Sequence, residues 1–161
     1  VNFSKSVDIN HRLMQRGKND SELFVIITSN KGLCGGYHTN IFKSISSYLA
    51  NNGNKNKDIK SITVGKYAEK ISKKLGIKNF ASFTDFSENS SMEQIQNLSR
   101  LITKEYVEGE YKSVKILYTE FKKSTLYKPV LREIFPISVS SFKNLVEELG
   151  EKENEEKSGE K

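Results

Sequence analysis

The chain has 161 residues, of which 35% are hydrophobic and 29% charged, a composition typical of a single soluble domain that can bury its own core. No apolar run approaches the roughly 20 residues that a membrane-spanning helix needs, and no signal peptide is evident. A single cysteine, Cys34, excludes an intramolecular disulfide, and with His11 and His38 it is too little for a zinc signature.

Charge is unevenly distributed along the chain. Residues 147–161 hold seven acids and three lysines and carry −4, so residues 1–146 carry +10 and the whole chain +6. A strongly basic body favours an acidic neighbour, which can be nucleic acid, an anionic membrane surface or an acidic protein. Scattered lysines that only keep the protein in solution are the simpler interpretation.

The strongest local pattern is a strand, a glycine loop and a helix. Leu23–Ile27 is a continuous apolar run, which predicts a strand buried on both faces, as at the centre of a parallel sheet. Gly32, Gly35 and Gly36 follow in a loop that can turn where a side chain would clash. A helical pattern then runs from about Thr39 to Leu49.

Strands and helices alternate after this unit. Apolar runs predict further strands at residues 58–64, 79–85, 114–121 and 130–137. One helix is expected between Gly65 and Gly76, and the next starts at a capping box, either Ser90 with Glu93 or Ser91 with Gln94. That helix ends near Gly109 and is expected to bury one apolar stripe, made of Met92, Ile95, Leu98, Ile102 and Tyr106.

Two features are expected after the fourth strand. The stretch 122–129 is too short for a crossover helix, so the last two strands are expected to form an antiparallel hairpin. A short helix capped by Ser140 or Ser141 comes next, before an acidic, disordered tail. Its apolar face is expected to consist of Phe142, Leu145, Val146 and Leu149.

The order of elements predicts an α/β, Rossmann-like fold. It has a mostly parallel five-stranded sheet with helices on both faces and an antiparallel last strand. Such sheets bind ligands beyond the carboxyl ends of their strands. We expect a lead-in at residues 1–20, a globular domain at 21–141, and the short helix with its acidic tail at 142–161.

The glycine loop matches neither of the two common phosphate-binding motifs. Its spacing is not G-x-G-x-x-G, and the next strand ends in Val64-Gly65-Lys66 without the acid that binds a ribose. Gly36 is followed by Tyr37 and His38, where a P-loop has lysine and a hydroxyl residue. Tight packing of strand against helix explains the glycines, and weak anion binding at the amides of residues 35 and 36 is the alternative.

Other candidate side chains each have a structural interpretation. Cys34 is either a reactive thiol at a helix start or a small buried residue, and His38 is a helix-start or surface residue. Three carboxylates have two interpretations: they form a cluster, or they serve as helix caps and loop residues. They are Asp85, Glu88 and Glu93. Four aromatic residues could stack on single-stranded nucleic acid, or they belong to the core and the sheet edge. They are Tyr111, Tyr118, Phe121 and Tyr127. The sequence assigns no catalytic, cofactor-binding or metal-binding residue.

The segment from Ile27 to Asn40 resembles the signature of the gamma subunit of F-type ATP synthases, S-D-[RK]-G-L-C-G-G-[FY]-N-x-N. Asn30 replaces the usual aspartate and His38 the usual asparagine. The resemblance covers about residues 7–138. The matching residues are Ser29, Lys31, Gly32, Leu33, Cys34, Gly35, Gly36, Tyr37 and Asn40.

Members of that family are much longer, with two terminal helices that wind into a shaft inside the catalytic head. The chain begins at Val1, and neither helix is evident in it, so the resemblance implies either the isolated globular domain of a gamma subunit or an unusual truncated relative. It implies a non-catalytic rotor part of the central stalk, without cofactor, that couples rotation of the membrane ring to ATP synthesis. Its expected partners are the alpha and beta subunits, an epsilon-type subunit and the ring.

In that setting the domain is peripheral, on the cytoplasmic face of a bacterial inner membrane or the matrix face of the mitochondrial one. Neither membrane insertion nor nucleic acid is expected, and Lys31 is expected to meet an acidic loop of a beta subunit. Two alternatives remain. One is a small nucleotide-binding α/β enzyme that uses the Gly32–Gly36 loop, and the other is a basic module that binds nucleic acid.

Overall fold

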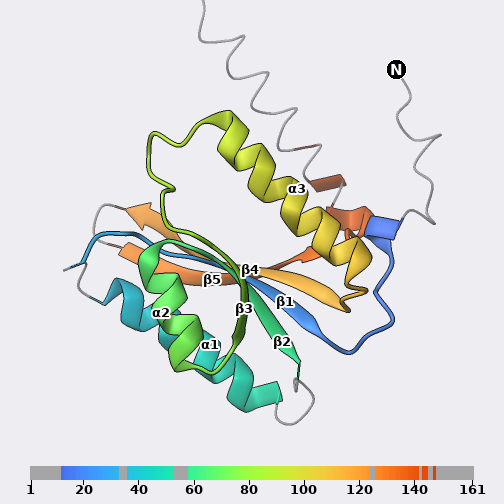
Figure 1. The fold of residues 1–161 in the computed structure, drawn as a ribbon, viewed down its shortest axis with the longest axis horizontal. Coiled ribbons are helices and arrows are strands. Elements are labelled where there is room, and N and C mark those ends of the chain that lie inside the picture. Colours follow the sequence, from blue (N-terminus) through green and yellow to red (C-terminus); the bar gives the residue numbers. More distant parts are fainter. Residues whose placement is uncertain are drawn as a thin grey trace, which may run out of the picture.

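The computed structural model describes residues 12–32, 36–52, 58–123 and 126–141, together with residues 143, 144 and 147 (Figure 1). The chain forms one five-stranded sheet in the order β3-β2-β1-β4-β5, and β5 is its antiparallel strand. The elements are η2 (Arg12–Met14), β1 (Glu22–Ile27), α1 (Tyr37–Asn52), β2 (Ile59–Val64), α2 (Lys66–Lys74), β3 (Lys78–Phe83), α3 (Met92–Glu108), β4 (Ser113–Lys123) and β5 (Leu126–Phe135).

Strand β1 lies at the centre of the sheet and is buried on both faces, as predicted. Its side chains alternate between two cores, because successive residues of a strand point to opposite faces. Phe24 and Ile26 pack with α1 and α2, whereas Leu23 and Val25 pack against α3. Figure 1 shows these helices on opposite sides of the sheet. The predicted α/β class, with helices on both faces, is therefore confirmed.

The hairpin of β4 and β5 is longer than predicted. Strand β4 continues to Lys123 and β5 begins at Leu126, so the predicted strand end at residue 121 and strand start at residue 130 are wrong. Pro129 lies within β5, opposite Thr119. An edge strand tolerates proline because one side of its backbone has no neighbouring strand to receive an N–H. Polar, edge-located residues lack the apolar pattern from which strand length was predicted.

Helix α3 begins with the second of the two predicted capping boxes. Gln94 N–H donates to Ser91 Oγ, and Ser91 N–H donates to Gln94 Oε1. Ser90 instead accepts a hydrogen bond from the N–H of Ser87, so the pairing of Ser90 with Glu93 is wrong. Ile102 and Tyr106 are buried as expected, but Met92 is 68% exposed and Ile95 48%. The apolar stripe extends beyond the part of α3 that packs on the sheet.

The ends of the globular unit differ from expectation in detail. The last helix begins at residue 139, earlier than predicted. Ser138 caps it in place of Ser140 or Ser141, because Ser141 N–H donates to Ser138 Oγ. Its expected apolar residues, and residues 148–161, lie outside the described residues. At the other end Gly17 N–H donates to the Tyr111 carbonyl, and Arg12 lies over the Tyr106 ring. The division at residues 20 and 141 stays a prediction.

Candidate functional site

A cleft lies where the fold class predicts a site, at the carboxyl ends of β1 and β2. It is an open cleft of about 700 Å³. The helix α1, the loop after β3 and the tip of the β4–β5 hairpin complete its walls. Its lining residues are Ile27, Thr28, Ser29, Asn30, Lys31, Tyr37, Val64, Phe86, Ser87, Glu88, Asn89, Phe121 and Tyr127.

Asn30 braces one wall of this cleft. Its Nδ2 donates to the carbonyl oxygens of Thr84, at 2.7 Å, and Phe86, at 3.1 Å, while its Oδ1 accepts from the N–H of Lys66 at 2.8 Å. One side chain therefore joins the loop after β1, the loop after β3 and the start of α2. The sequence identified this position only as a departure from the family signature, since contacts between such distant segments have no local pattern.

Thr28 completes the start of α2. Gly65, the residue before α2, has no side chain to cap the helix, and Ala68 N–H donates instead to Thr28 Oγ1 at 2.8 Å. The first N–H groups of a helix have no acceptors within the helix. Two of these N–H groups in α2 therefore donate to side chains that follow β1, those of Thr28 and Asn30. Gly65 has φ +96°, and a Cβ there would lie 2.3 Å from the Thr28 carbonyl oxygen. This glycine lets β1 and α2 approach closely.

Tyr67 occupies the space beside the glycine loop. A Cβ on Gly32 would lie 2.7 Å from the Tyr67 hydroxyl. The His38 ring stacks on Tyr67, with a centroid distance of 3.8 Å, and its Nε2 lies 3.0 Å from the Lys31 carbonyl. A carbonyl only accepts, so Nε2 is the donor. Gly32 thus packs against the Tyr67 side chain.

Three aromatic rings connect α1 to the hairpin tip. Tyr37 lies 6.3 Å from both Phe121 and Tyr127, and the last two are 6.1 Å apart, measured between ring centroids. Phe121 is 66% exposed and lines the cleft, whereas Tyr111 is buried in the core beside α3. The predicted aromatic set therefore divides, and Tyr118 is half-buried in β4.

The signature residues fall partly within the described chain. Ser29 Oγ accepts the N–H of Lys31 and shapes the turn, and Asn40 N–H donates to the Gly36 carbonyl at the start of α1. Helix α1 starts at Tyr37, two residues before the predicted start, because this bond already closes its first turn. Leu33, Cys34 and Gly35 lie outside the described residues. The predictions about the Cys34 thiol and about anion binding at the amide of residue 35 therefore stay predictions.

The predicted carboxylates do not form a cluster. Asp85, Glu88 and Glu93 are exposed, and the ion pair involving one of them joins Glu88 to Lys31 at 4.0 Å. A pair so exposed contributes little to stability. Within the described ranges no group of three or more histidine, cysteine or acidic residues is placed to hold a metal ion. No helix in the same ranges has the length and apolar character to cross a membrane.

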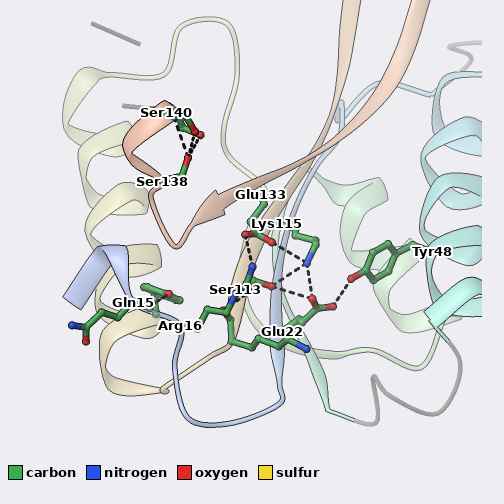
Figure 2. Close-up of polar contacts among 12 residues, drawn as sticks. Gln15, Arg16, Glu22, Tyr48, Ser113, Lys115, Glu133, Ser138 and Ser140 are labelled. Atoms are coloured by element: carbon green, nitrogen blue, oxygen red, sulfur yellow. Dashed lines mark hydrogen bonds and ion pairs between the residues drawn. The ribbon is translucent and has the colours of Figure 1, made fainter. Parts of the chain in front are cut away.

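A polar network lies at the opposite, amino-terminal edge of the sheet, beneath α1 (Figure 2). Glu22 of β1 accepts hydrogen bonds from Tyr48 at 2.7 Å and from Ser113 at 3.0 Å, and it pairs with Lys115 of β4. Lys115 also pairs with Glu133 of β5 at 3.6 Å. The network joins α1 to three strands and was not predicted, since β1 and β4 are far apart in the sequence.

Opposing effects set the pKa values of the central pair. Burial alone raises the pKa of Glu22, but hydrogen bonds from Lys115 and Tyr48 and the Lys115 charge outweigh it, so the pKa is lowered. Burial alone lowers the pKa of Lys115, and its hydrogen bond to Glu22 and the charge of that carboxylate raise it above the usual value. Both groups are ionised at neutral pH, with side chains only 7% and 14% exposed.

Comparison with known proteins then gives the family. A sequence model of the family described as ATP synthase matches residues 2–160, which extends beyond both ends of the resemblance over residues 7–138. The chain belongs to the ATP synthase family. The ATP synthase gamma chain of Desulfitobacterium hafniense is 28% identical over 130 residues, and that of Anaeromyxobacter sp. strain K is 30% identical over 129. The predicted resemblance to the gamma subunit is confirmed.

The chain spans less than half the length of these relatives. The alignments cover 81% and 80% of this chain but 45% and 44% of the two gamma chains. Solved structures agree on the fold of the shared part. The central stalk of Tetrahymena thermophila mitochondrial ATP synthase matches with a TM-score of 0.60 at 22% identity, over 78% of this chain and 55% of that one. The rotor of the Euglena gracilis mitochondrial enzyme matches with a TM-score of 0.55 at 17% identity, over 89% and 52%.

Proposed function

We propose that this chain is a non-catalytic part of the rotor of a proton-translocating ATP synthase. It lies at the foot of the central stalk and couples rotation of the membrane ring to ATP synthesis in the catalytic head. Its partners are the alpha and beta subunits, an epsilon-type subunit and the ring, and nucleic acid is not among them. The observation that carries the proposal is the family match over residues 2–160.

The geometry of the cleft supports a mechanical function. Its walls are tied together by Asn30 and Thr28, and the hydroxyl of Tyr67 fills the space beside Gly32. A phosphate-binding loop needs open backbone amides at that position. The described residues of the cleft also hold no nucleophile with a base and an orienting group beside it, the arrangement that nucleophilic catalysis uses. ATP chemistry then belongs to other subunits.

The complex tests this proposal directly. An affinity tag on the native gene is used to purify the protein from membranes of its own organism, where it is peripheral on the cytoplasmic or matrix face. Alpha, beta, epsilon-type and ring subunits are expected to co-purify, together with ATP hydrolysis that pumps protons in reconstituted vesicles. Recovery of the protein without these subunits, or of an active synthase that lacks it, contradicts the proposal.

Lys31 gives a residue-level test of the same function. It is exposed at the rim of the cleft, so it can meet an acidic loop of a beta subunit. Lys31→Glu in the purified synthase is expected to lower ATP-driven proton pumping about tenfold, because attraction becomes repulsion. Lys104→Glu, on the exposed side of α3, is the matched control and leaves pumping unchanged. Equal pumping by both variants removes Lys31 from the contact.

A further inference from the structure

The chain enters and leaves the sheet at one corner, beside the end of α3. The N–H of Ile137, two residues after β5, donates to the Leu13 carbonyl of η2 at 2.8 Å. The N–H of Gly17 donates to the Tyr111 carbonyl, before β4, at 2.9 Å. A Cβ on Gly17 would lie 2.0 Å from the Glu110 carbonyl oxygen, so the two backbones are in direct contact there. Figure 1 shows η2 and the end of β5 side by side at this corner.

Tyr106 of α3 contacts both the entering and the leaving segment. Its side chain is fully buried, and its hydroxyl donates to the Gln15 carbonyl. The Arg12 guanidinium lies 4.9 Å from the centre of the Tyr106 ring. It also donates to the carbonyl oxygens of Gln15, at 3.0 Å, and Tyr106, at 3.3 Å. Phe135, the last residue of β5, stacks on the same ring with the ring centroids 5.0 Å apart.

Arg16 connects the entering segment to the charged network at the amino edge (Figure 2). Its guanidinium pairs with Glu133 of β5 at 3.3 Å and donates to the Lys112 carbonyl. Glu133 in turn pairs at 3.6 Å with Lys115 of β4, which is the partner of the buried Glu22. An arginine suits this position because its planar guanidinium can donate in several directions at once. The four side chains that we call the clasp are Arg12, Arg16, Tyr106 and Glu133.

We propose that the clasp fixes the entering and leaving segments to the sheet, so that the domain turns as one body with them. This inference rests on the rotor function proposed above, because a domain that swivels on the segments carrying it passes on less of their rotation. Without the clasp, isolated backbone hydrogen bonds such as those of Gly17 and Ile137 would remain, and such bonds open locally at little cost. Arg12 and Arg16 are therefore positioning residues, which act through the orientation of the whole domain.

Hydrogen exchange in the 161-residue chain measures whether the two arginines hold the segments in place. In Arg12→Met with Arg16→Met, the N–H groups of Gly17 and Ile137 are expected to exchange at least about tenfold faster, because the corner opens locally. The N–H of Val25, in the central strand β1, is expected to change its exchange rate less than about twofold, because the core stays closed. Unchanged exchange at Gly17 and Ile137 would show that the arginines do not hold this corner.

Coupling in the purified synthase measures what the clasp contributes to function. In the same double variant, the number of protons pumped per ATP hydrolysed is expected to fall at least about threefold, while ATP hydrolysis stays within about twofold of wild type. Arg12→Lys with Arg16→Lys keeps both positive charges and is expected to retain at least about half of the coupling. Arg100→Met is the matched control, since this guanidinium donates to Asn97 within α3, and it leaves the ratio unchanged.

A milder variant keeps the inference testable if the double variant does not fold. Tyr106→Phe keeps the ring and removes the hydrogen bond from its hydroxyl to the Gln15 carbonyl. It is expected to speed exchange of the Ile137 N–H at least about threefold in a folded chain. Exchange at the wild-type rate in this variant and in the lysine double variant alike would contradict a clasp centred on Tyr106.

The outcomes separate this inference from the rotor function. An active synthase that lacks the protein contradicts the rotor function itself. A synthase that contains the arginine double variant and pumps as many protons per ATP as wild type overturns the clasp alone, and so do equal losses in Arg100→Met. Hydrolysis and pumping that fall in parallel would make these side chains necessary for assembly only, which also overturns it.

Discussion

Glu22 and Lys115 lie side by side under α1, and each keeps the other charged in the interior. The carboxylate accepts three hydrogen bonds, from Lys115, Tyr48 and Ser113, so its desolvation is offset only while these donors remain. Loss of one partner of a buried pair costs more than loss of both, because it leaves a single charge uncompensated.

Lys115→Met is therefore expected to lower the free energy of unfolding by about 3 kcal/mol at neutral pH. Glu22→Gln in the same chain removes the stranded charge, so the double variant is expected to recover most of that loss. Urea unfolding followed by circular dichroism measures both. A double variant that is less stable than Lys115→Met contradicts the interpretation.

The same pair predicts a pH dependence of stability. The pKa of Glu22 is lowered from 4.5, so its contribution is present above the unfolded value and is lost as the pH falls through the folded one. The pKa of Lys115 is raised from 10.5, so its contribution is lost as the pH rises through its folded value. In Lys115→Met the pKa of Glu22 rises, and the stability gap to wild type is expected to narrow as the pH is lowered from about 7 to about 5. A gap that stays constant over this range contradicts the charge explanation.

Asn30 has an Nδ2 amide group where the aspartate of the family signature has a second carboxylate oxygen. Its Nδ2 donates to two carbonyl oxygens, and a carboxylate has no hydrogen to donate. Asn30→Asp is expected to lower the free energy of unfolding by about 2 kcal/mol, the sum of two lost hydrogen bonds. Asn89→Asp, in the exposed loop before α3, makes the same chemical change and is expected to cost less than about 0.5 kcal/mol. Similar losses at both positions would show that Asn30 does not brace the cleft.

At the level of elements, the sequence predicted the strands and helices that have a local apolar pattern. It missed the strand ends and contacts that depend on neighbouring segments. The uninterrupted apolar run of β1 identified the central strand, because only a strand covered on both faces needs such a run. The extent of β5 was missed, because an edge strand containing Pro129 needs no such run. A cleft does lie at the carboxyl edge, where the fold class predicts ligands, but its braces, Asn30 and Tyr67, contact segments that no local pattern connects.

The turns on either side of α2 offer a controlled comparison of two glycines. Both have positive φ, +96° at Gly65 and +68° at Gly76, so alanine is strained at each. Only at Gly65 would the new Cβ also collide with backbone, 2.3 Å from the Thr28 oxygen, since nothing lies within 4 Å at Gly76.

Gly76→Ala is expected to cost about 1 kcal/mol from backbone strain alone. Gly65→Ala is expected to cost at least about 3 kcal/mol, because β1 and α2 must also move apart. Thermal unfolding of the two variants under the same conditions measures the difference. Equal losses would mean that the β1–α2 contact is loose and that strain alone decides.

For the whole molecule, the two edges of the sheet hold the layers together in different ways. At the amino edge an ionic network joins α1 to β1, β4 and β5. At the carboxyl edge neutral hydrogen bonds, one accepted by Thr28 and others made by Asn30, join β1 to α2 and to the loop after β3. Each edge thus connects segments that the two cores separate, and the proposed rotor function would make use of such bracing.

These braces lead to a prediction about nucleotides. Open α/β sheets bind them at the carboxyl edge, beside the first strand, where glycines let phosphates reach the amides. Here the Tyr67 hydroxyl lies 2.7 Å from the position that a Cβ of Gly32 would take, and β2 ends in Val64-Gly65-Lys66 without an acid for the ribose. We expect any binding of ATP with Mg²⁺ to have a dissociation constant of about 5 mM or weaker. At about 5 mM ATP the stabilisation is then at most about 0.4 kcal/mol, so the melting temperature is expected to shift by no more than about 1 °C. A shift of several degrees that Lys31→Glu abolishes would establish a phosphate site in this cleft and favour the nucleotide-binding alternative.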